Sequence, residues 1–412
     1  MQTKSGDISG KRILLISSPN IDNSLRIKEE IRLLQSQGAI VDMVSQRQGK
    51  ATGEFVNKFF LVSAFEDARF LPASQNPKRI PRILSNLLRN TFRSLLTFLS
   101  TLVVRTPLQE FLTQAVSQYD IFWVYDAYGL PSAAKAKRMN VGDCVYLIYE
   151  TQDLVPEYDF NKAQSRLRRI QERLFLRDVD AMVTAGESYA AYYRKRYSRH
   201  KVVRNILVRP NIPPIVIAGR PATAQPYSLV FYGNLAVNRP IATLLKAFAE
   251  VEGDYTVTFI GENRVGSELE ELIRELKLSE RVFICDPVGP YSGVQKVSDY
   301  DFGLVALDGS NENERRAPTS KLCTYMAAGL AIIASDLQGI RMQAGSELEA
   351  IYVQGRSISD WQTALQSAVN ATTTEIDKMK ASSLSRAHNL KELTNDQDYV
   401  DIFSRAGRDW SI

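Results

Sequence analysis

Histidine and cysteine are scarce in this sequence. Its 412 residues include the two histidines His200 and His388 and the three cysteines Cys144, Cys285 and Cys323. The cysteines lie far apart, without the spacing of metal ligands, and no signal peptide opens the chain, so we expect a protein of the reducing cytoplasm. Two histidines also make a histidine-based metal site or a Ser-His-Asp triad hard to build.

Long apolar runs and a dinucleotide fingerprint are also missing. The uncharged, mostly apolar stretch at 94–104 is far shorter than the roughly 20 residues that a membrane-spanning helix needs. The first predicted strand is followed by Ser-Pro-Asn-Ile-Asp instead of a G-x-G-x-x-G turn. This difference argues against a dinucleotide site.

Acidic residues are absent between Ala68 and Gln109. Apolar side chains recur there at helical spacing, with Arg82, Arg89 and Arg93 on the other side, so the stretch 77–106 is predicted to form a basic amphipathic helix or helix pair. Two interpretations stay open. The segment could lie in a membrane interface, attracted by anionic headgroups. Alternatively, its apolar stripe could pack on the sheet of the first domain while the arginines are solvated.

The residues that are present fit an α/β protein of two domains. Hydrophobic residues make up 44% and charged residues 24% of the chain, and its length suits two domains of about 200 residues each. Short apolar runs alternate with amphipathic stretches in both halves, which predicts Rossmann-like domains with mainly parallel sheets. The predicted strands are 12–17, 39–45, 120–125, 144–149, 201–208, 228–232, 255–260, 282–285, 302–307, 330–334 and 350–353.

Polar or glycine residues follow several of these strands. Open α/β sheets bind ligands at the carboxyl ends of their strands, so these positions are site candidates, although each could also be a plain connector. In the first domain they are Ser18, Asn20, Asp22, Asp126, Glu150, Gln152 and Asp153. In the second domain they are Gly233, Asn234, Gly261 and Glu262.

The segment from Glu314 to Asp336 has the pattern of a loop, a helix, a glycine and a strand. Thr319 and Ser320 are N-cap candidates for a helix that begins at Lys321. The free N–H groups of its first turn, the positive end of its dipole and the Lys321 ammonium together suit a phosphate or diphosphate.

This segment also carries a family resemblance. The stretch PTSKLCTYMAAGLAIIASD resembles the donor-binding segment of family-4 glycosyltransferases, which have the GT-B fold. In that family the helix N-terminus holds the diphosphate of a nucleotide sugar, and a Glu of the helix holds the ribose hydroxyls. Thr324 stands at the position of that Glu. Arg316 stands where the family has another Glu, although Glu312 and Glu314 are close by.

The segment YETQDLVPEY resembles a second motif of the family. Gln152 stands where the family has a histidine, and a Gln side chain cannot take a proton. Asp126, Glu150 and Asp153 therefore remain as carboxylates that could orient or deprotonate an acceptor hydroxyl. By the same resemblance Arg239 matches a basic residue that approaches the donor diphosphate, with an exposed loop arginine as the alternative.

The resemblance implies a retaining, metal-independent hexosyltransferase without a resident cofactor, whose two domains face a central cleft. Its substrates would be a nucleotide-diphosphate sugar and a saccharide or lipid-linked saccharide, in bacterial-type polysaccharide or glycolipid assembly at the cytoplasmic membrane face. Nucleic acid is not an expected partner. The implied domains are 1–209 for the acceptor, a linker at 210–226, 227–394 for the donor and a helix at 395–412 that returns to the first domain.

The implied site divides into three groups of residues. The donor-binding group is Gly233, Asn234, Arg239, Gly261, Glu262, Glu314, Thr319, Ser320, Lys321, Leu322 and Thr324. The catalytic group is Asp126, Glu150, Gln152, Asp153, Arg239 and Lys321. The acceptor-side group is Ser18, Asn20 and Asp22.

Two other functions stay open. The altered residues Arg316, Thr324 and Gln152 leave room for a non-catalytic protein of this fold, which binds a nucleotide or a glycan or serves as a scaffold that supports an active partner. A sugar-nucleotide 2-epimerase shares the fold but needs acid and base groups in the cleft. The scarcity of histidines counts against the epimerase.

Overall fold

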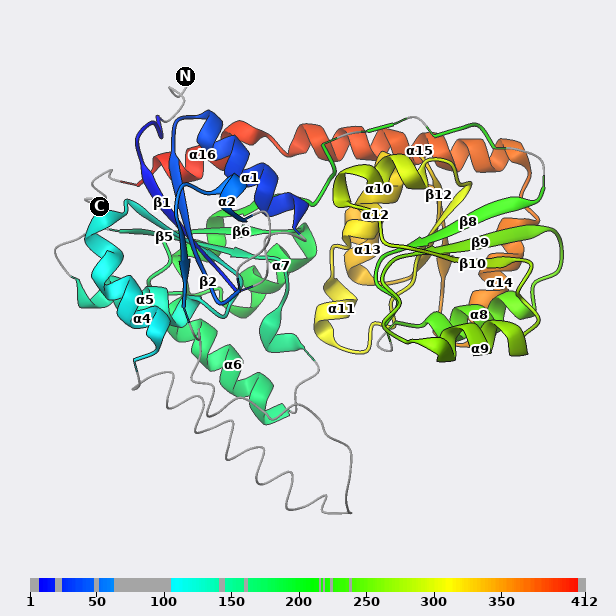
Figure 1. Ribbon diagram of the computed structural model, residues 1–412, viewed down its shortest axis with the longest axis horizontal. Coiled ribbons are helices and arrows are strands. Elements are labelled where there is room, and N and C mark those ends of the chain that lie inside the picture. Colours follow the sequence, from blue (N-terminus) through cyan, green and yellow to red (C-terminus); the bar gives the residue numbers. More distant parts are fainter. Residues whose placement is uncertain are drawn as a thin grey trace, which may run out of the picture. The chain divides into compact units, whose positions relative to one another are not determined.

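The computed structural model describes residues 7–18, 24–47, 52–62, 105–140, 145–158, 162–214, 216–217, 219–222, 225–236 and 239–406. Arg82, Arg89 and Arg93 of the predicted amphipathic segment lie outside these residues, as do Asn20 and Asp22. The chain forms two compact units, drawn in Figure 1. The first comprises Met1–Ala185, Tyr189–Arg209 and Asn395–Ile412, and the second comprises Gly186–Ser188 and Pro210–Thr394.

The first unit is built on a parallel sheet with the order β3-β2-β1-β4-β5-β6-β7. The strands are β1 (Arg12–Ser17), β2 (Ile40–Ser45), β3 (Phe59–Leu61), β4 (Ile121–Tyr125), β5 (Tyr146–Thr151), β6 (Ala181–Thr184) and β7 (Ile206–Val208). The order changes direction between β1 and β4. In a doubly wound sheet this switch point opens a crevice at the carboxyl ends of the strands.

Helices surround this sheet. They are α1 (Leu25–Ser36), α2 (Thr52–Phe55), α4 (Pro107–Ala115), α5 (Leu130–Met139), α6 (Lys162–Phe175), α7 (Glu187–Arg196), α16 (Asp396–Ser404) and the 3-10 helices η3 (Val116–Gln118), η4 (Val155–Glu157) and η5 (Lys201–Asn205). Helices α1 and α16 pack on one face, and α5 lies on the opposite face with α4 beside it (Figure 1).

The central strand β4 shows why the sheet is buried on both faces. Its sequence is Ile-Phe-Trp-Val-Tyr, and every position is buried, as expected for a parallel strand between two helix layers. Trp123 meets Phe403 of α16 edge to face, with ring centroids 5.6 Å apart. The last described helix is therefore part of the first unit's core.

The second unit has a parallel sheet with the order β10-β9-β8-β11-β12-β13, the order of a doubly wound dinucleotide-type fold. The strands are β8 (Tyr227–Tyr232), β9 (Tyr255–Ile260), β10 (Val282–Cys285), β11 (Phe302–Val305), β12 (Ala331–Ser335) and β13 (Ala350–Val353). One face packs against α8 (Ile241–Ala249), α9 (Ser267–Glu275) and α14 (Ile358–Val369). The other packs against α10 (Pro290–Val297), α12 (Ser320–Ala327), α13 (Gln338–Ala344) and α15 (Thr373–Leu393).

A glycine in β11 fixes the position of α12. A Cβ atom on Gly303 would lie 2.4 Å from the Tyr325 ring, so the absence of a side chain lets that ring rest on the strand. The Tyr325 hydroxyl accepts a hydrogen bond from the Tyr232 N–H at 2.7 Å. Helix α12 is thereby held beside the end of β8.

Several segments differ from the sequence prediction. Lys201–Asn205 was expected in a strand but forms η5, in which Val203 alone is buried; the run therefore lacks the alternation of a strand. The expected loop after β11 contains the short helix α11 (Glu312–Arg316). Helices α7 and α13, and the edge elements α2 and β3, had no clear sequence signal.

None of the helices in the described ranges is both long and apolar enough to cross a lipid bilayer.

The segment 210–226, expected to be a linker, makes contacts within the second unit. The Ile217 N–H donates to the carbonyl oxygen of Ala327 at 2.7 Å, and Lys391 Nζ donates to the carbonyl oxygen of Pro214 at 2.5 Å. The Ala222 N–H donates to the Asp377 carboxylate at 2.7 Å. These described parts of the segment are thus anchored to α12 and α15.

Candidate functional site

Two glycines shape the carboxyl end of β8 in the second unit. A Cβ atom on Gly261 would lie 2.1 Å from the Gly233 carbonyl oxygen. One on Gly233, whose φ is +133°, would lie 2.7 Å from Cε and 3.0 Å from Nζ of Lys321. Because no side chain stands on Gly233, the Lys321 side chain can lie directly on the backbone there. We call Gly233 and Gly261 the glycine floor.

Lys321 lies in the first turn of α12 and is half-buried. Its Nζ lies 5.3 Å from the centroid of the Phe231 ring, and within the described ranges it forms no ion pair. Burial lowers the pKa of Lys321 to about 7, and the nearby Arg239 lowers it as well. The Thr319 hydroxyl caps the helix by accepting from the Lys321 N–H at 3.3 Å. A cation without a counter-ion at a helix N-terminus suits a diphosphate.

Further charged groups surround this floor. Asp308 follows β11, and burial together with Glu314 raises its pKa, whereas Arg356 and Arg239 lower it. Arg239 thus acts electrostatically on both Asp308 and Lys321. Glu314 accepts from the Ser310 N–H at 3.0 Å and from the Ser310 hydroxyl at 2.9 Å.

The other predicted donor residues divide by their surroundings. Asn234, Glu262 and Ser320 are exposed, and Glu262 pairs with Arg264 at 2.6 Å. The Leu322 side chain belongs to the apolar core, so only its backbone could touch a ligand.

The two altered motif positions have partners of their own. The Thr324 hydroxyl donates to the Ser320 carbonyl oxygen at 3.0 Å. Arg316 forms an ion pair with Glu312. Neither position therefore offers the carboxylate that the family resemblance assigns to it.

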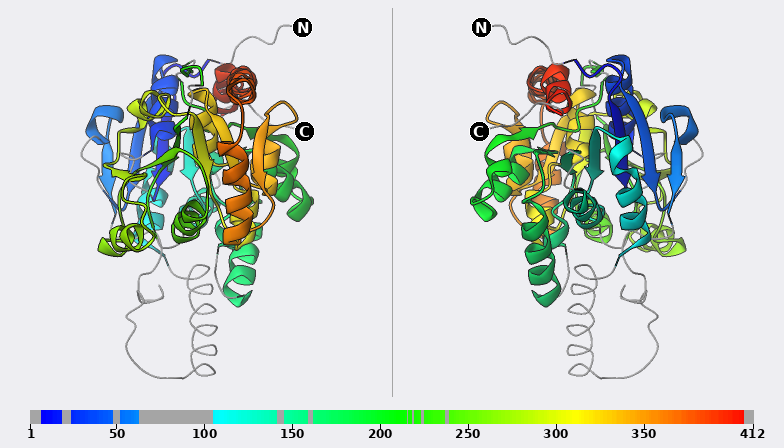
Figure 2. Two further views of the ribbon diagram at one scale, coloured as in Figure 1. Left: turned by 90° about the vertical axis from the view of Figure 1, so that its right-hand side faces the viewer. Right: turned by 90° about the vertical axis from the view of Figure 1, so that its left-hand side faces the viewer.

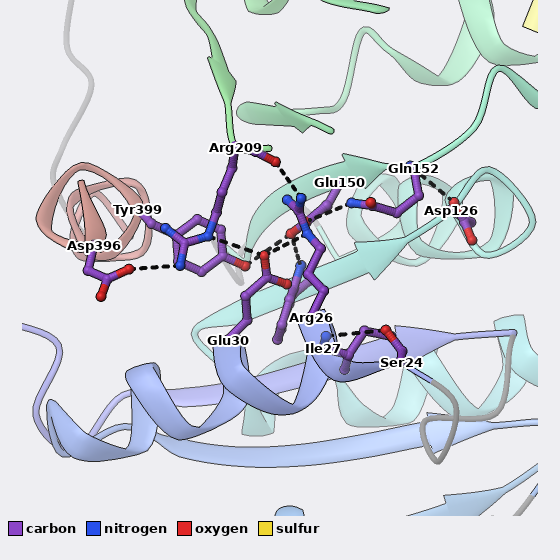
Figure 3. Close-up of polar contacts among 11 residues, drawn as sticks. Ser24, Arg26, Ile27, Glu30, Asp126, Glu150, Gln152, Arg209, Asp396 and Tyr399 are labelled. Carbon is purple, nitrogen blue, oxygen red and sulfur yellow. Dashed lines mark hydrogen bonds and ion pairs between the residues drawn. The ribbon is translucent and has the colours of Figure 1, made fainter. Parts of the chain in front are cut away.

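In the first unit, Glu150 at the end of β5 is buried and fully hydrogen-bonded (Figure 3). Its Oε1 accepts from Arg26 Nη2 at 2.6 Å and from Gln152 Nε2 at 3.1 Å. Its Oε2 accepts from Trp123 Nε1 and from the Tyr399 hydroxyl, both at 3.0 Å. With 0% of its surface exposed, Glu150 is placed to hold its neighbours and is not placed to receive an acceptor hydroxyl.

Sequence reasoning missed the charged residues around Glu150. Arg26 Nε lies 2.8 Å from Glu30 Oε1, and its guanidinium also donates to the Arg209 carbonyl oxygen. Arg209 Nε lies 3.4 Å from Glu30 Oε1, and its Nη2 lies 2.8 Å from Asp396. Burial raises the pKa of Glu30 to about 8, against the opposing effect of Arg26. We call Arg26, Glu30, Glu150, Arg209 and Tyr399 the buried charge cluster.

Only Arg26 carried a usable sequence signal. Ser24 caps α1 by accepting from the Ile27 N–H at 3.3 Å, so Arg26 lies in the first turn of the helix that follows β1. In a doubly wound sheet that turn borders the switch point. Glu30 lies only four residues along the helix, but the other partners, Glu150 and Arg209, lie 124 and 183 residues away, which no local pattern reveals.

Asp126 follows β4 and has the geometry of a functional group. Its φ of +74° is uncommon for a residue other than glycine. Its N–H donates to the Glu150 carbonyl oxygen at 2.9 Å, and its carboxylate accepts from the Gln152 N–H at 3.4 Å. Burial and then Asp153 raise the pKa of Asp126 to about 7. A half-buried carboxyl with a pKa near neutrality is suited to proton transfer.

Ser18 and Asp126 follow neighbouring strands of the first sheet. Ser17 pairs with Tyr125 across β1 and β4, so Ser18 and Asp126 leave adjacent strands in the same direction. The half-buried residues Gln152 and Asp153 follow β5 on the next strand. The described acceptor-side candidates therefore gather at one edge of the first sheet.

Comparison with known proteins relates this geometry to a fold. Residues 226–371 match the family model of glycosyl transferases group 1. No curated protein matches the sequence significantly. HepE from Anabaena, in complex with UDP and glucose, has a TM-score of 0.66 at 13% identity, covering 96% of this chain and 99% of that chain.

Two further solved structures agree. The lipopolysaccharide outer core galactosyltransferase WaaB in its apo form has a TM-score of 0.59 at 15% identity, covering 96% of this chain and 98% of that chain. TarM from S. aureus, a variant in complex with UDP, Fondaparinux and alpha-GlcNAc-glycerol, has a TM-score of 0.63 at 11% identity, covering 95% of this chain and 99% of that chain. This chain thus has the GT-B fold of two Rossmann-like domains, and residues 226–371 within its second unit match glycosyl transferases group 1.

Proposed function

We propose that this protein is a glycosyltransferase that moves a sugar from a nucleotide-diphosphate donor to an acceptor hydroxyl. The observation that supports this most is the state of Lys321 on the glycine floor, a cation without an ion-pair partner within the described ranges, next to the N-terminus of α12. The floor lies inside the matched segment 226–371. HepE, which shares the fold, was solved with UDP and glucose.

The donor diphosphate is bound by the second unit. Lys321, Arg239 and the N–H groups at Thr319 and Ser320 supply positive charge where negative charge develops on the leaving diphosphate, and such preorganised electrostatics usually contributes most to catalysis. Because these groups neutralise the diphosphate, we propose that the reaction needs no resident metal or other cofactor. Transfer activity that persists in a chelator would agree with this.

The reaction exchanges one bond at the donor sugar for another. The bond between C1 and the phosphate oxygen breaks, and its electron pair leaves with the diphosphate. The acceptor oxygen forms the new bond to C1 from the same face, so the anomeric configuration is retained. The acceptor proton passes to a carboxylate or to the leaving phosphate oxygen.

Asp126 is the carboxylate that we assign to the acceptor. Glu150 is buried and its oxygens are occupied, and Gln152 cannot take a proton. Asp153 raises the pKa of Asp126 through its charge, which improves Asp126 as a base near neutral pH. Gln152, held by Glu150 at 3.1 Å, orients the acceptor side.

The acceptor is proposed to be a saccharide or a lipid-linked saccharide at the cytoplasmic face of a membrane. The predicted basic amphipathic segment at 77–106, with Arg82, Arg89 and Arg93, supports this location. Such a place fits the assembly of a polysaccharide or glycolipid.

A non-catalytic protein of the same fold is the second candidate. Thr324 uses its hydroxyl within the helix and Arg316 pairs with Glu312, so no carboxylate is available at the two altered positions. Such a protein would bind the nucleotide but would neither hydrolyse nor transfer the sugar.

A thermal-shift screen against UDP, GDP, dTDP, ADP and CMP, with Lys321→Ala as control, tests the proposal. A diphosphate present at about 100 times its Kd adds about 2.7 kcal/mol to the free energy of unfolding. A shift with one base that is lost in Lys321→Ala names the donor for transfer assays. A shift without any transfer would favour a non-catalytic protein that binds the nucleotide. No shift with any nucleotide would contradict the glycosyltransferase and would favour a non-catalytic scaffold.

A further inference from the structure

The positive charge of the chain is concentrated in one described segment. Residues 162–204 contain twelve Lys or Arg and four Asp or Glu, a formal net charge of +8, whereas the whole chain carries +5. All other residues together therefore carry −3. This segment comprises α6, β6, α7, most of η5 and the connections between them.

Helix α6 presents part of this charge as a stripe. Lys162, Arg166, Ile170 and Arg173 recur at intervals of four, four and three residues, and Arg177 follows just after the helix. At 100° per residue the four side chains within the helix lie within about 80° of one another around its axis. All five are exposed, Ile170 with 47% of its surface, while the opposite side of α6 is buried. Figures 1 and 2 show α6 extending past the edge of the first sheet.

The stripe continues onto the end of α7 and onto η5. The Tyr197 hydroxyl, just after α7, donates to Glu172 in the last turn of α6 at 2.6 Å, so the end of α7 lies beside that turn. Burial lowers the pKa of His200, and the charges of Arg173 and Arg177 lower it further. The exposed basic residues on this second part are Lys195, Arg196, Arg199, Lys201 and Arg204. We call the stripe and these five residues together the α6–α7 basic surface.

Three of the four acidic residues of the same segment have partners elsewhere. Glu172 is buried and accepts from three tyrosine hydroxyls, at 2.6, 2.7 and 3.1 Å. Asp178 pairs with Arg138 and Asp180 pairs with Lys137. Within the described ranges, none of the Lys and Arg residues of the α6–α7 basic surface forms an ion pair.

We infer that the α6–α7 basic surface binds the anionic headgroups of a phospholipid bilayer. A cluster of unpaired Lys and Arg on an exposed helix is attracted to such a surface, and Ile170 in the middle of the stripe can enter the boundary between headgroups and acyl chains. The inference rests on the proposed function and deepens it, because it identifies the surface of the protein that contacts the membrane in which the acceptor is held. It concerns residues other than the predicted segment 77–106.

A nucleic acid fits this surface less well. Proteins that bind single strands combine basic grooves with exposed aromatic rings on which bases stack. The tyrosines of α7 and its end, Tyr189, Tyr192, Tyr193 and Tyr197, are all buried. A bilayer needs only charge and an apolar side chain, both of which are present.

Co-sedimentation of the whole protein with lipid vesicles tests the inference. The triple variant Arg166→Glu, Arg173→Glu, Arg177→Glu is compared with wild type and with a matched control, Lys246→Glu, Arg274→Glu, Lys296→Glu, which makes the same charge change at exposed residues of the second unit. The vesicles are phosphatidylcholine, alone or with about one third phosphatidylglycerol.

We expect wild type and control to sediment with the anionic vesicles but not with the neutral vesicles. We also expect neither protein to bind an RNA homopolymer. Each basic residue near an anionic surface contributes roughly a fivefold gain in partitioning, so the triple variant should partition at least about 100-fold less. Raising the salt from about 0.1 M to about 1 M shortens the Debye length from about 10 Å to about 3 Å and should release the wild type.

Three outcomes would overturn the inference: no sedimentation of wild type with anionic vesicles, equal sedimentation of the triple variant, or binding to the RNA in place of the vesicles. A thermal shift with UDP in each variant shows that the second unit is intact. This shift also separates the two proposals, because vesicle binding requires no donor site and the donor site requires no vesicle.

Discussion

Replacing Gly233 by alanine should weaken nucleotide binding without removing any charge. The new Cβ atom would lie 2.7 Å from Cε of Lys321, closer than such atoms stay, and 3.0 Å from its Nζ. The flexible end of the Lys321 side chain must therefore shift away from Gly233. A hydrogen bond to a charged group contributes about 1.5–3 kcal/mol, so the Kd for a nucleoside diphosphate should rise about 10- to 100-fold.

Backbone strain accompanies this change and needs its own control. Gly233 has φ +133°, and a side chain in such a conformation costs about 1–3 kcal/mol of stability. Gly266 has φ +86° with nothing within 4 Å of an added Cβ atom. Gly266→Ala should therefore lower the unfolding temperature in a similar way while leaving the Kd for UDP unchanged.

A double-mutant cycle shows whether Gly233 acts through Lys321. Calorimetric titration with UDP gives the Kd of wild type, Gly233→Ala, Lys321→Ala and the double variant. If the alanine acts by displacing Lys321, it should cost little once Lys321 is gone, which is the non-additivity expected for residues in contact. The reasoning would be refuted if Gly233→Ala weakened binding equally in both backgrounds.

Three further predictions concern titratable groups. Asp126→Asn should lower kcat by about 10²- to 10⁴-fold with little change in the Kd for UDP. Since the pKa of Asp126 is about 7, the kcat of the wild type should rise with pH up to about 7. A rise that persists in the variant would exclude Asp126 as the base. The Lys321 pKa of about 7 should rise when a diphosphate binds, so UDP binding at pH 8 should take up a proton. Calorimetric titrations in buffers of different ionisation enthalpy measure this uptake. A binding enthalpy that is independent of the buffer would contradict the prediction. Glu30 has a pKa of about 8 in the folded protein against an ordinary 4.5, so its contribution to the free energy of unfolding declines as pH rises from about 4.5 to about 8. Glu30→Gln should flatten this decline when thermal unfolding is measured across that pH range. An unchanged pH profile would argue against a protonated Glu30.

Much of the fold could be predicted because buried parallel strands leave short apolar runs in the sequence. The strands at Arg12–Ser17, Tyr255–Ile260, Val282–Cys285 and Ala350–Val353 have the predicted bounds. The prediction of a strand at Lys201–Asn205 was wrong because a short run with two valines does not distinguish a strand from a 3-10 turn. The edge strand Phe59–Leu61 gave no signal, since three residues are too few to show a period.

The candidate site was predictable only where its geometry is local. Thr319 and Lys321 lie in one helical turn, so their spacing already indicated an anion site. By contrast, Glu150 was a candidate base because it follows a strand, and its burial depends on Arg26 and Tyr399, which lie 124 and 249 residues away. The positive φ of Asp126 also depends on tertiary contacts, since Asp tolerates that conformation without requiring it.

The position of α16 has a consequence for how the protein is made. The chain leaves the first unit after Arg209 and returns at Asn395, and α16 then supplies Tyr399 and Phe403 to the first core. On the ribosome, the first unit must wait for these residues while the second unit is synthesised, about 10–40 s at roughly 5–20 residues per second. During that interval Trp123 lacks its Phe403 contact and Glu150 lacks the Tyr399 hydroxyl. The domain that begins first is completed last, and a chain cut short before Asn395 would leave its N-terminal core open.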